Sequence, residues 1–139
     1  MPKPKQLNHV TVLVTDKKRA EAFYCGILGL EAHSFGEGGK HLWVRVGTQY
    51  VHLTDNSGSP RPGSFDHFAI GYDDFEILLG ELVTKGVEVF DMDENAEAVH
   101  INEKLDEKNR QFFVRDPDGN LIEIFDLHNA YFNPAGSPK

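Results

Sequence analysis

The chain has 139 residues, which is enough for one compact domain or for two small repeats that share a core. Its 14 basic and 22 acidic residues give a formal net charge of −8, which opposes binding to nucleic acid, and no stretch is apolar for long enough to span a bilayer. The N-terminal residues show no secretory signal, and the single cysteine, Cys25, cannot form an internal disulfide, so we expect a cytoplasmic protein.

The first half of the chain predicts the element order βαβββ. A strand over residues 7–14 leads into a helix that begins near Asp16, and Gly29 is a plausible end for this helix. The apolar residues of the helix have the spacing of a single face: Ala20, Phe23, Tyr24 and Ile27. Three strands, divided by glycine-containing turns, are expected to follow: residues 31–35, 40–46 and 50–54.

The second half predicts the same order after a turn-rich segment over residues 56–64. A strand over residues 65–72 precedes a helix, and Asp73 and Glu76 have the spacing of an N-terminal capping box. Three further strands are expected: residues 87–91, 111–115 and 120–125. Residues 92–110 are acidic and weakly periodic, which predicts a long loop or a lid.

Both halves contain a short apolar strand that carries a histidine at the same place. Leu7-Asn8-His9-Val10-Thr11-Val12 matches Phe65-Asp66-His67-Phe68-Ala69-Ile70. Each half also ends in a strand with a metal-ligating side chain, which is His52 in the first half and Glu123 in the second. Because imidazole and carboxylate are ligands of divalent transition metals, these four residues form a candidate metal site.

The alternation of side chains along a strand predicts which residues accompany the two histidines. His9 shares a face with Thr11, and the valines between them are left to pack on a helix. His67 shares a face with Ala69 and Gly71, whose small size leaves space for a ligand. If the sheet curls, its concave face would carry all four candidate ligands.

Taken in order, these segments resemble the vicinal oxygen chelate superfamily. This superfamily includes glyoxalase I, fosfomycin resistance proteins, methylmalonyl-CoA epimerase, extradiol dioxygenases and bleomycin resistance proteins. The resemblance extends from Leu7 to Asp126. Its most specific parts are four segments: Asn8-His9-Val10, Phe23-Tyr24 with Leu28-Gly29-Leu30, Asp66-His67-Phe68-Ala69-Ile70, and Phe113-Val114-Arg115-Asp116-Pro117-Asp118-Gly119-Asn120-Leu121-Ile122-Glu123.

The resemblance implies an α+β fold in which two βαβββ modules form a curled mixed β-sheet that cups a metal site. We expect a single domain over residues 1–139, with the first module at residues 7–55 and the second at residues 65–126. Residues 56–64 would then be the linker, and residues 127–139 a C-terminal tail.

The resemblance also implies that His9, His67 and Glu123 are metal ligands. Position 52 corresponds to a fourth ligand, and histidine stands there in place of the usual glutamate or glutamine. His52 and Glu123 are the catalytic candidates, because a ligand that leaves the metal can act as a base. The metal would be nickel, zinc, manganese, cobalt or iron, and the site would lie within one chain or be shared across a homodimer.

The function implied is that of an enzyme acting on a small molecule with adjacent oxygens, through a metal-stabilised enolate or oxyanion, in the lyase or isomerase class. The alternatives are a fosfomycin-type thiol transferase, a dioxygenase, and a metal-free protein that binds a drug-like compound as bleomycin resistance proteins do. Phe113 stands where extradiol dioxygenases carry a tyrosine, and Arg110-Gln111-Phe112-Phe113 stands where fosfomycin transferases carry serine and tyrosine. The substrate itself stays open.

Several other residues have simpler interpretations. Cys25 is expected to be a small core residue, and Asp116-Pro117-Asp118-Gly119 a turn that directs the strand of Glu123. Trp43 and Phe113 would line the pocket or fill the core. The remaining histidines match no ligand pattern and are expected at the surface or in loops: His33, His41, His100 and His128.

Overall fold

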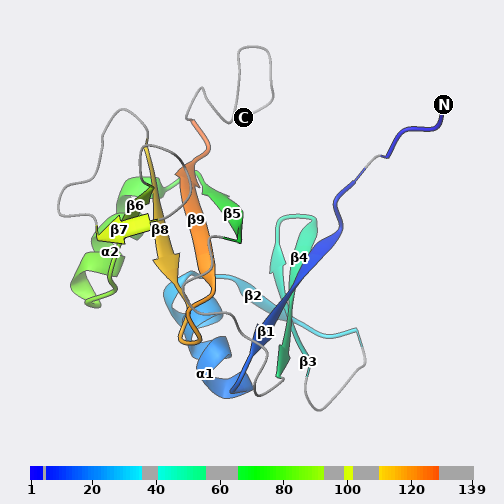
Figure 1. Ribbon diagram of the computed structural model, residues 1–139, viewed down its shortest axis with the longest axis horizontal. Coiled ribbons are helices and arrows are strands. Elements are labelled where there is room, and N and C mark those ends of the chain that lie inside the picture. Colours follow the sequence, from blue (N-terminus) through cyan, green and yellow to red (C-terminus); the bar gives the residue numbers. More distant parts are fainter. Residues whose placement is uncertain (5, 36–40, 56–65, 93–98, 102–109, 129–139) are drawn as a thin grey trace. The chain divides into compact units, whose positions relative to one another are not determined.

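The structure is a computed structural model that describes residues 1–4, 6–35, 41–55, 66–92, 99–101 and 110–128. The chain forms two compact units, Met1–Pro60 and Arg61–Lys139. Each unit contains one mixed β-sheet and helical segments (Figure 1). Within the described residues, no helix has the length and apolar character needed to cross a membrane.

The first unit has the predicted order βαβββ, with a π-helical turn after its α-helix. Its elements are β1 (His9–Val14), α1 (Lys17–Glu21), η1 (Ala22–Ile27), β2 (Glu31–His33), β3 (His41–Val46) and β4 (Gln49–Asp55). The strands lie in the order β1-β4-β3-β2, with β1 parallel to β4 and the other neighbours antiparallel. The repeat read from the sequence is therefore present in this unit.

The helical segment of the first unit begins and ends where the sequence indicates. Asp16 is the N-cap, and its carboxylate accepts a hydrogen bond of 3.1 Å from the backbone N–H of Arg19. The helix then widens, and the N–H of Leu28 donates to the carbonyl of Phe23 at 3.0 Å. Gly29 has a φ of 78°, a left-handed conformation that glycine adopts without strain, and the chain turns into β2.

The core of the first unit lies on one face of its sheet. In β1, Val12 and Val14 are buried whereas His9 and Thr11 are exposed, which agrees with the predicted alternation. α1 contacts β3 and β4. The buried side chains of these two strands are Leu42, Val44, Val51 and Leu53. The residues between them, which include Trp43 and His52, therefore project from the opposite face.

The described residues of the second unit form one strand more than the sequence predicts. Its elements are β5 (His67–Tyr72), α2 (Phe75–Thr84), β6 (Phe90–Met92), β7 (Val99–Ile101), β8 (Gln111–Arg115) and β9 (Leu121–Asp126). They form a sheet in the order β5-β9-β8-β6-β7, with β5 parallel to β9. The loop predicted over residues 92–110 is wrong at Met92, which ends β6, and at Val99–Ile101, because this segment pairs with β6. The rest of that loop, residues 93–98 and 102–109, lies outside the described residues.

The predicted capping box of the second helix does not form. α2 begins at Phe75, and its N-cap is Asp74, whose side chain makes no capping hydrogen bond. The carboxylate of Glu76 instead accepts a 2.8 Å hydrogen bond from Arg110, which also donates to Asp126 at 3.1 Å. An ion pair with a residue distant in sequence thus competes with the local cap.

The apolar side chains of α2 pack on its sheet. Phe75, Leu78 and Leu82 are buried, and the ring of Phe75 lies 5.3 Å from the ring of Phe112 in β8. The buried positions on the packed face of β9 are Ile122 and Ile124. The residue between these two isoleucines is Glu123, which must project from the other face.

A tight turn sets the start of the strand that carries Glu123. The buried carboxylate of Asp116 accepts hydrogen bonds of 2.9 Å from the backbone N–H groups of Asp118 and Asn120 and from the side-chain amide of Asn120. Gly119 has a φ of 87°, which closes the turn. The sequence correctly indicates a turn over residues 116–119.

Candidate metal centre

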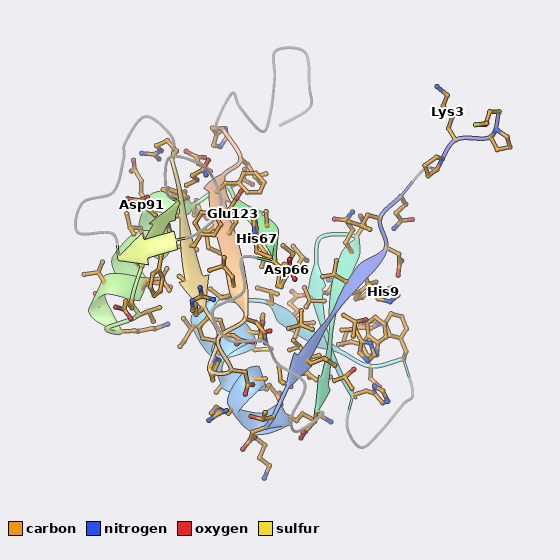
Figure 2. All side chains as sticks on the ribbon, viewed as in Figure 1. Lys3, His9, Asp66, His67, Asp91 and Glu123 are labelled. Carbon is orange, nitrogen blue, oxygen red and sulfur yellow. The ribbon has the colours of Figure 1, made fainter. Side chains whose placement is uncertain are left out.

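His67 and Glu123 lie side by side in the second unit, on neighbouring parallel strands. Ala69 is paired with Glu123, and His67 with Leu121, so the imidazole and the carboxylate occupy the same face (Figure 2). His67 Nε2 lies 3.4 Å from Glu123 Oε1, and the two side chains are 25% and 9% exposed. The parallel pairing of the first and last strands therefore brings together two ligands that are distant in sequence.

This spacing fits two ligands of a single ion. Two atoms bound at about 2.1 Å to one metal, in tetrahedral or adjacent octahedral positions, lie about 3 to 3.5 Å apart. The separation of His67 Nε2 and Glu123 Oε1 falls in this range. The pair can therefore chelate a cation without a large movement of either strand.

The environment of Glu123 favours a positively charged neighbour. Burial raises the pKa of the Glu123 carboxyl, and the adjacent imidazole of His67 opposes this shift. In the part of the chain that the structure describes, His67 is the side chain that pairs with Glu123. A carboxylate removed from water requires a cation or several hydrogen bonds, and a divalent ion would meet this requirement.

The space beside His67 is smaller than the sequence predicts. A Cβ atom added to Gly71 would lie 2.5 Å from Leu127 Cδ2 and 2.8 Å from Phe125 Cζ. The expectation that Gly71 leaves room for a ligand is thus wrong, since these two side chains fill that room. Ala69, which is exposed, is the small residue that leaves the face open next to the His67–Glu123 pair.

His9 lies at the start of β1 in the first unit, and its ring is oriented by its neighbour. His9 Nδ1 lies 2.8 Å from the side-chain oxygen of Asn8. Because an amide oxygen only accepts, Nδ1 carries the hydrogen, and Nε2 of the neutral ring keeps its lone pair. Histidines that bind a metal through one ring nitrogen commonly donate a hydrogen bond from the N–H of the other. The sequence identifies His9, but the role of Asn8 emerges only from the structure.

His52 has partners at both ring nitrogens. Its Nε2 lies 2.8 Å from His41 Nδ1 and 3.3 Å from Thr54 Oγ1, and its Nδ1 lies 3.4 Å from Thr11 Oγ1. To bind a metal through either nitrogen, His52 must exchange one of these contacts. Its ring centroid is 6.3 Å from that of His9, whereas imidazoles in adjacent positions on one ion lie about 4.5 to 5 Å apart.

His41 is the residue that the sequence interpretation missed. It was expected at the surface or in a loop, yet its ring stacks on His52 with centroids 4.9 Å apart and planes inclined by 24°. The sequence feature that could have identified His41 is the turn between β3 and β4, where Val46 pairs with Gln49 across Gly47 and Thr48. This short hairpin fixes the register and brings His41 diagonally next to His52.

Other polar side chains have roles away from the candidate ligands. Arg45 pairs with Glu31 at 2.7 Å, and Arg115 donates to the carbonyl of Gly119 at 2.8 Å. Cys25 is half-buried, and burial raises the pKa of its thiol, which opposes a nucleophilic role. The side chain of His100 lies outside the described residues.

The predicted ligands fall into one group in each unit. The first unit holds His9 and His52, and the second holds His67 and Glu123. Among the described residues, no cluster contains three or more potential ligands from histidine, cysteine, aspartate or glutamate. The convergence of all four on one ion stays a prediction.

Comparison with known proteins agrees with the architecture of both units. The model of the Glyoxalase/Bleomycin resistance protein/Dioxygenase superfamily matches residues 6–124. The chain is 27% identical over 131 residues to glutathione transferase FosA of Serratia marcescens, a match that covers 86% of this chain and 79% of that protein.

Two solved structures show the same fold. A glyoxalase family protein from Bacillus anthracis is 25% identical with a TM-score of 0.70, and the match covers 91% of this chain and 98% of that one. TnmS3, an antibiotic binding protein from Streptomyces sp. CB03234, has a TM-score of 0.67, with the same two coverages. Because TnmS3 is only 23% identical, its likeness concerns the fold alone.

Proposed function

Because the chain belongs to the Glyoxalase/Bleomycin resistance protein/Dioxygenase superfamily, we propose that it is a metal-dependent enzyme acting on a small molecule with adjacent oxygens, in the lyase or isomerase class. The observation that carries this proposal is the buried carboxylate of Glu123, 3.4 Å from His67. A nickel, zinc, manganese, cobalt or iron ion held by His9, His67 and Glu123 would polarise the substrate oxygens and stabilise an enolate or oxyanion.

The residues around these ligands support their roles. Asn8 fixes the ring of His9, and the turn stabilised by Asp116 fixes the start of the Glu123 strand. These contacts reduce the freedom of the ligands before anything binds, and such support is usual around ligating side chains. Glu123 and His67 thus form a preorganised pair, and His9 is the proposed second imidazole ligand.

We assign His52 a catalytic role as a fourth ligand or as a base. Its Nε2 lies within hydrogen-bonding distance of His41 and Thr54, so these two residues can hold the ring while a proton is present or absent. A base must lie within about 3 Å of the proton it takes, and a fixed ring meets this condition more easily. The active form is proposed to be a homodimer.

Two other functions compete with this proposal. The similarity to glutathione transferase FosA favours a thiol transfer as the alternative reaction. A metal-free protein that binds a drug-like molecule is the alternative outside catalysis. It is favoured by His52, because both ring nitrogens already contact side chains of the chain itself.

A metal-resolved activity screen tests these functions against one another. The substrates are a methylglyoxal–glutathione adduct, catechol, and fosfomycin with glutathione, each assayed with the five ions after treatment with EDTA. We expect turnover of at least one of these compounds that EDTA abolishes and that one ion restores. Turnover of fosfomycin would select the thiol transferase. Tight binding of one compound that ignores EDTA, with no turnover under any ion, would contradict the enzyme proposal.

A further inference from the structure

Aromatic rings gather on the sheet face of the first unit that projects away from its buried core. They come from all four strands of the sheet, and one more ring, that of Phe35, lies two residues after the end of β2. Consecutive rings lie 4.1 to 5.2 Å apart between centroids. The members of this ring cluster are His9, His33, Phe35, His41, Trp43, Tyr50 and His52.

Trp43 is the centre of the ring cluster and is held on several sides. His52 stacks on the indole with centroids 4.1 Å apart and planes inclined by 6°. His9 and Phe35 each meet the indole edge-on, with centroids 4.9 Å away at 71° and 80°. Because these contacts fix the ring before a ligand arrives, binding would cost little side-chain entropy.

Phe35 extends the ring cluster toward solvent. Its ring contacts Trp43, Tyr50 and His33, yet the residue is 55% exposed. A large aromatic residue left this exposed on a face that already carries other rings is typical of a binding surface. The charge next to the cluster is balanced, since Arg45 pairs with Glu31 at 2.7 Å, so the surface suits a neutral guest better than an anion.

We propose that the ring cluster binds a neutral planar aromatic group carried by the substrate. This inference rests on the proposed function, because His9 belongs both to the cluster and to the proposed ligand set. The centroid of His9 is only 4.9 Å from that of Trp43. A molecule whose oxygens reach an ion at His9 would therefore bring an attached ring into contact with Trp43 or Phe35.

The test compares two ligands that differ only in aromaticity. One is a dihydroxynaphthalene with adjacent hydroxyls, and the other is the fully saturated diol of the same carbon skeleton. Trp43 is the single tryptophan of the chain, so its fluorescence reports events at the ring cluster without labelling. We expect the aromatic diol to quench this fluorescence and to bind at least about tenfold more tightly than the saturated diol, which corresponds to about 1.4 kcal/mol.

Variants at Phe35 provide the control. Because Phe35 is exposed, Phe35→Leu should leave the fold intact, which circular dichroism verifies. We expect this change to weaken binding of the aromatic diol several-fold and to leave the saturated diol unaffected, whereas Phe35→Tyr keeps a ring and keeps the affinity. Equal affinities for the two diols in the native protein, or an unchanged affinity in Phe35→Leu, would overturn the inference.

Repeating the titrations with EDTA separates this inference from the proposed function. If the aromatic diol keeps its preference and its affinity after chelation, the ring cluster binds rings but the metal proposal fails. If chelation abolishes binding of both diols and their affinities were equal before it, the metal proposal stands and the ring-binding inference fails. Loss of affinity on chelation with a retained preference for the aromatic diol supports both.

Discussion

A single amide at residue 8 determines which nitrogen of His9 can face a ligand. Asn8 accepts from Nδ1, so Nε2 is left with its lone pair, and in the described part of the chain no hydrogen bond to Nε2 of His9 is seen. The equivalent position of the second repeat carries a carboxylate rather than an amide, since Asp66 precedes His67. The two histidines therefore have different immediate neighbours despite the shared motif.

Removing the amide of Asn8 should weaken metal binding. We expect Asn8→Ala to lower the affinity for the bound ion about 10- to 100-fold, because His9 loses the acceptor that fixes its ring. Asn8→Asp keeps an acceptor and should retain most of the affinity. Competition with a fluorescent zinc chelator measures both values, and equal affinities for the native protein and Asn8→Ala would show that the ring of His9 needs no such support.

The contribution of Asp126 to the free energy of unfolding should depend on pH. Burial alone would raise the pKa of Asp126, but the backbone N–H of His128 and the guanidinium of Arg110 hold the pKa below its usual value. An acid with a lowered folded-state pKa stabilises the protein above its unfolded pKa, about 3.9, and this contribution disappears as pH falls through the folded pKa. We expect Asp126→Asn to lower the free energy of unfolding at pH 7 by about 1 to 3 kcal/mol.

The difference between Asp126→Asn and the native protein should shrink when urea unfolding is repeated below about pH 4. Asp74→Asn is the matched control, since Asp74 is exposed and its side chain makes no capping hydrogen bond. We expect it to change stability by less than about 0.5 kcal/mol. A deficit in Asp126→Asn that stays constant from pH 7 to pH 3 would rule out the proposed ionic role.

At the scale of single residues, the sequence identifies ligand candidates because they occupy equivalent places in two repeats, His9 with His67 and His52 with Glu123. It does not identify His41, because its contact with His52 depends on the register of a hairpin rather than on a motif. Glu76 shows the opposite case, in which a correct local spacing is overruled by Arg110. Local sequence patterns therefore identify residues that can bind a metal better than they identify which side chains contact one another.

At the scale of elements, two glycines test how the second unit is packed. A Cβ at Gly71 in β5 would approach Leu127 and Phe125 to less than 3 Å, whereas nothing lies within 4 Å of a Cβ at Gly80 in α2. We expect Gly71→Ala to destabilise by about 1 to 3 kcal/mol through overpacking, and Gly80→Ala to stabilise by about 1 kcal/mol through helix propensity. Thermal unfolding of the two variants measures both, and a neutral or stabilising Gly71→Ala would show that Leu127 yields easily.

The elements themselves were largely predictable. Alternating apolar residues fix the strands and their buried faces, and Asp16 and Gly29 mark the ends of the first helical segment. β7 was not predicted because its three residues, Val99–Ile101, are too few to show the apolar–polar alternation of a strand within a polar stretch. The π-helical turn of η1 also has no signature in the sequence, because its apolar residues keep the spacing of an ordinary helix.

At the scale of the whole molecule, the duplicated βαβββ order and its motifs predict the superfamily to which the chain belongs. The order of elements does not predict whether the ligands of one ion come from the two modules of one chain or from modules of two protomers. The proposed homodimer makes this question experimental. A closed two-fold dimer places every interface residue twice, so each dimer would carry two equivalent sites.

Mixing two inactive variants tests whether these sites are shared between protomers. We expect equal amounts of His9→Ala and Glu123→Gln subunits, unfolded and refolded together, to regain roughly a quarter of the native metal content. About half of the dimers would be mixed, and one of the two sites in each mixed dimer would be intact. Either variant refolded alone is the control and should regain none. No recovery in a mixture shown by mass spectrometry to contain mixed dimers would place all ligands in one chain.

The central claim is that the buried carboxylate of Glu123, together with the neighbouring imidazole of His67, helps hold a divalent ion. The most direct measurement is the metal content of protein purified without chelator, determined by elemental analysis and compared with Glu123→Gln and with Glu31→Gln, whose carboxylate is exposed and pairs with Arg45. We predict about one ion per chain in the native protein and in Glu31→Gln, and a large loss in Glu123→Gln. Native protein without metal, or an equal content in all three proteins, would contradict the claim.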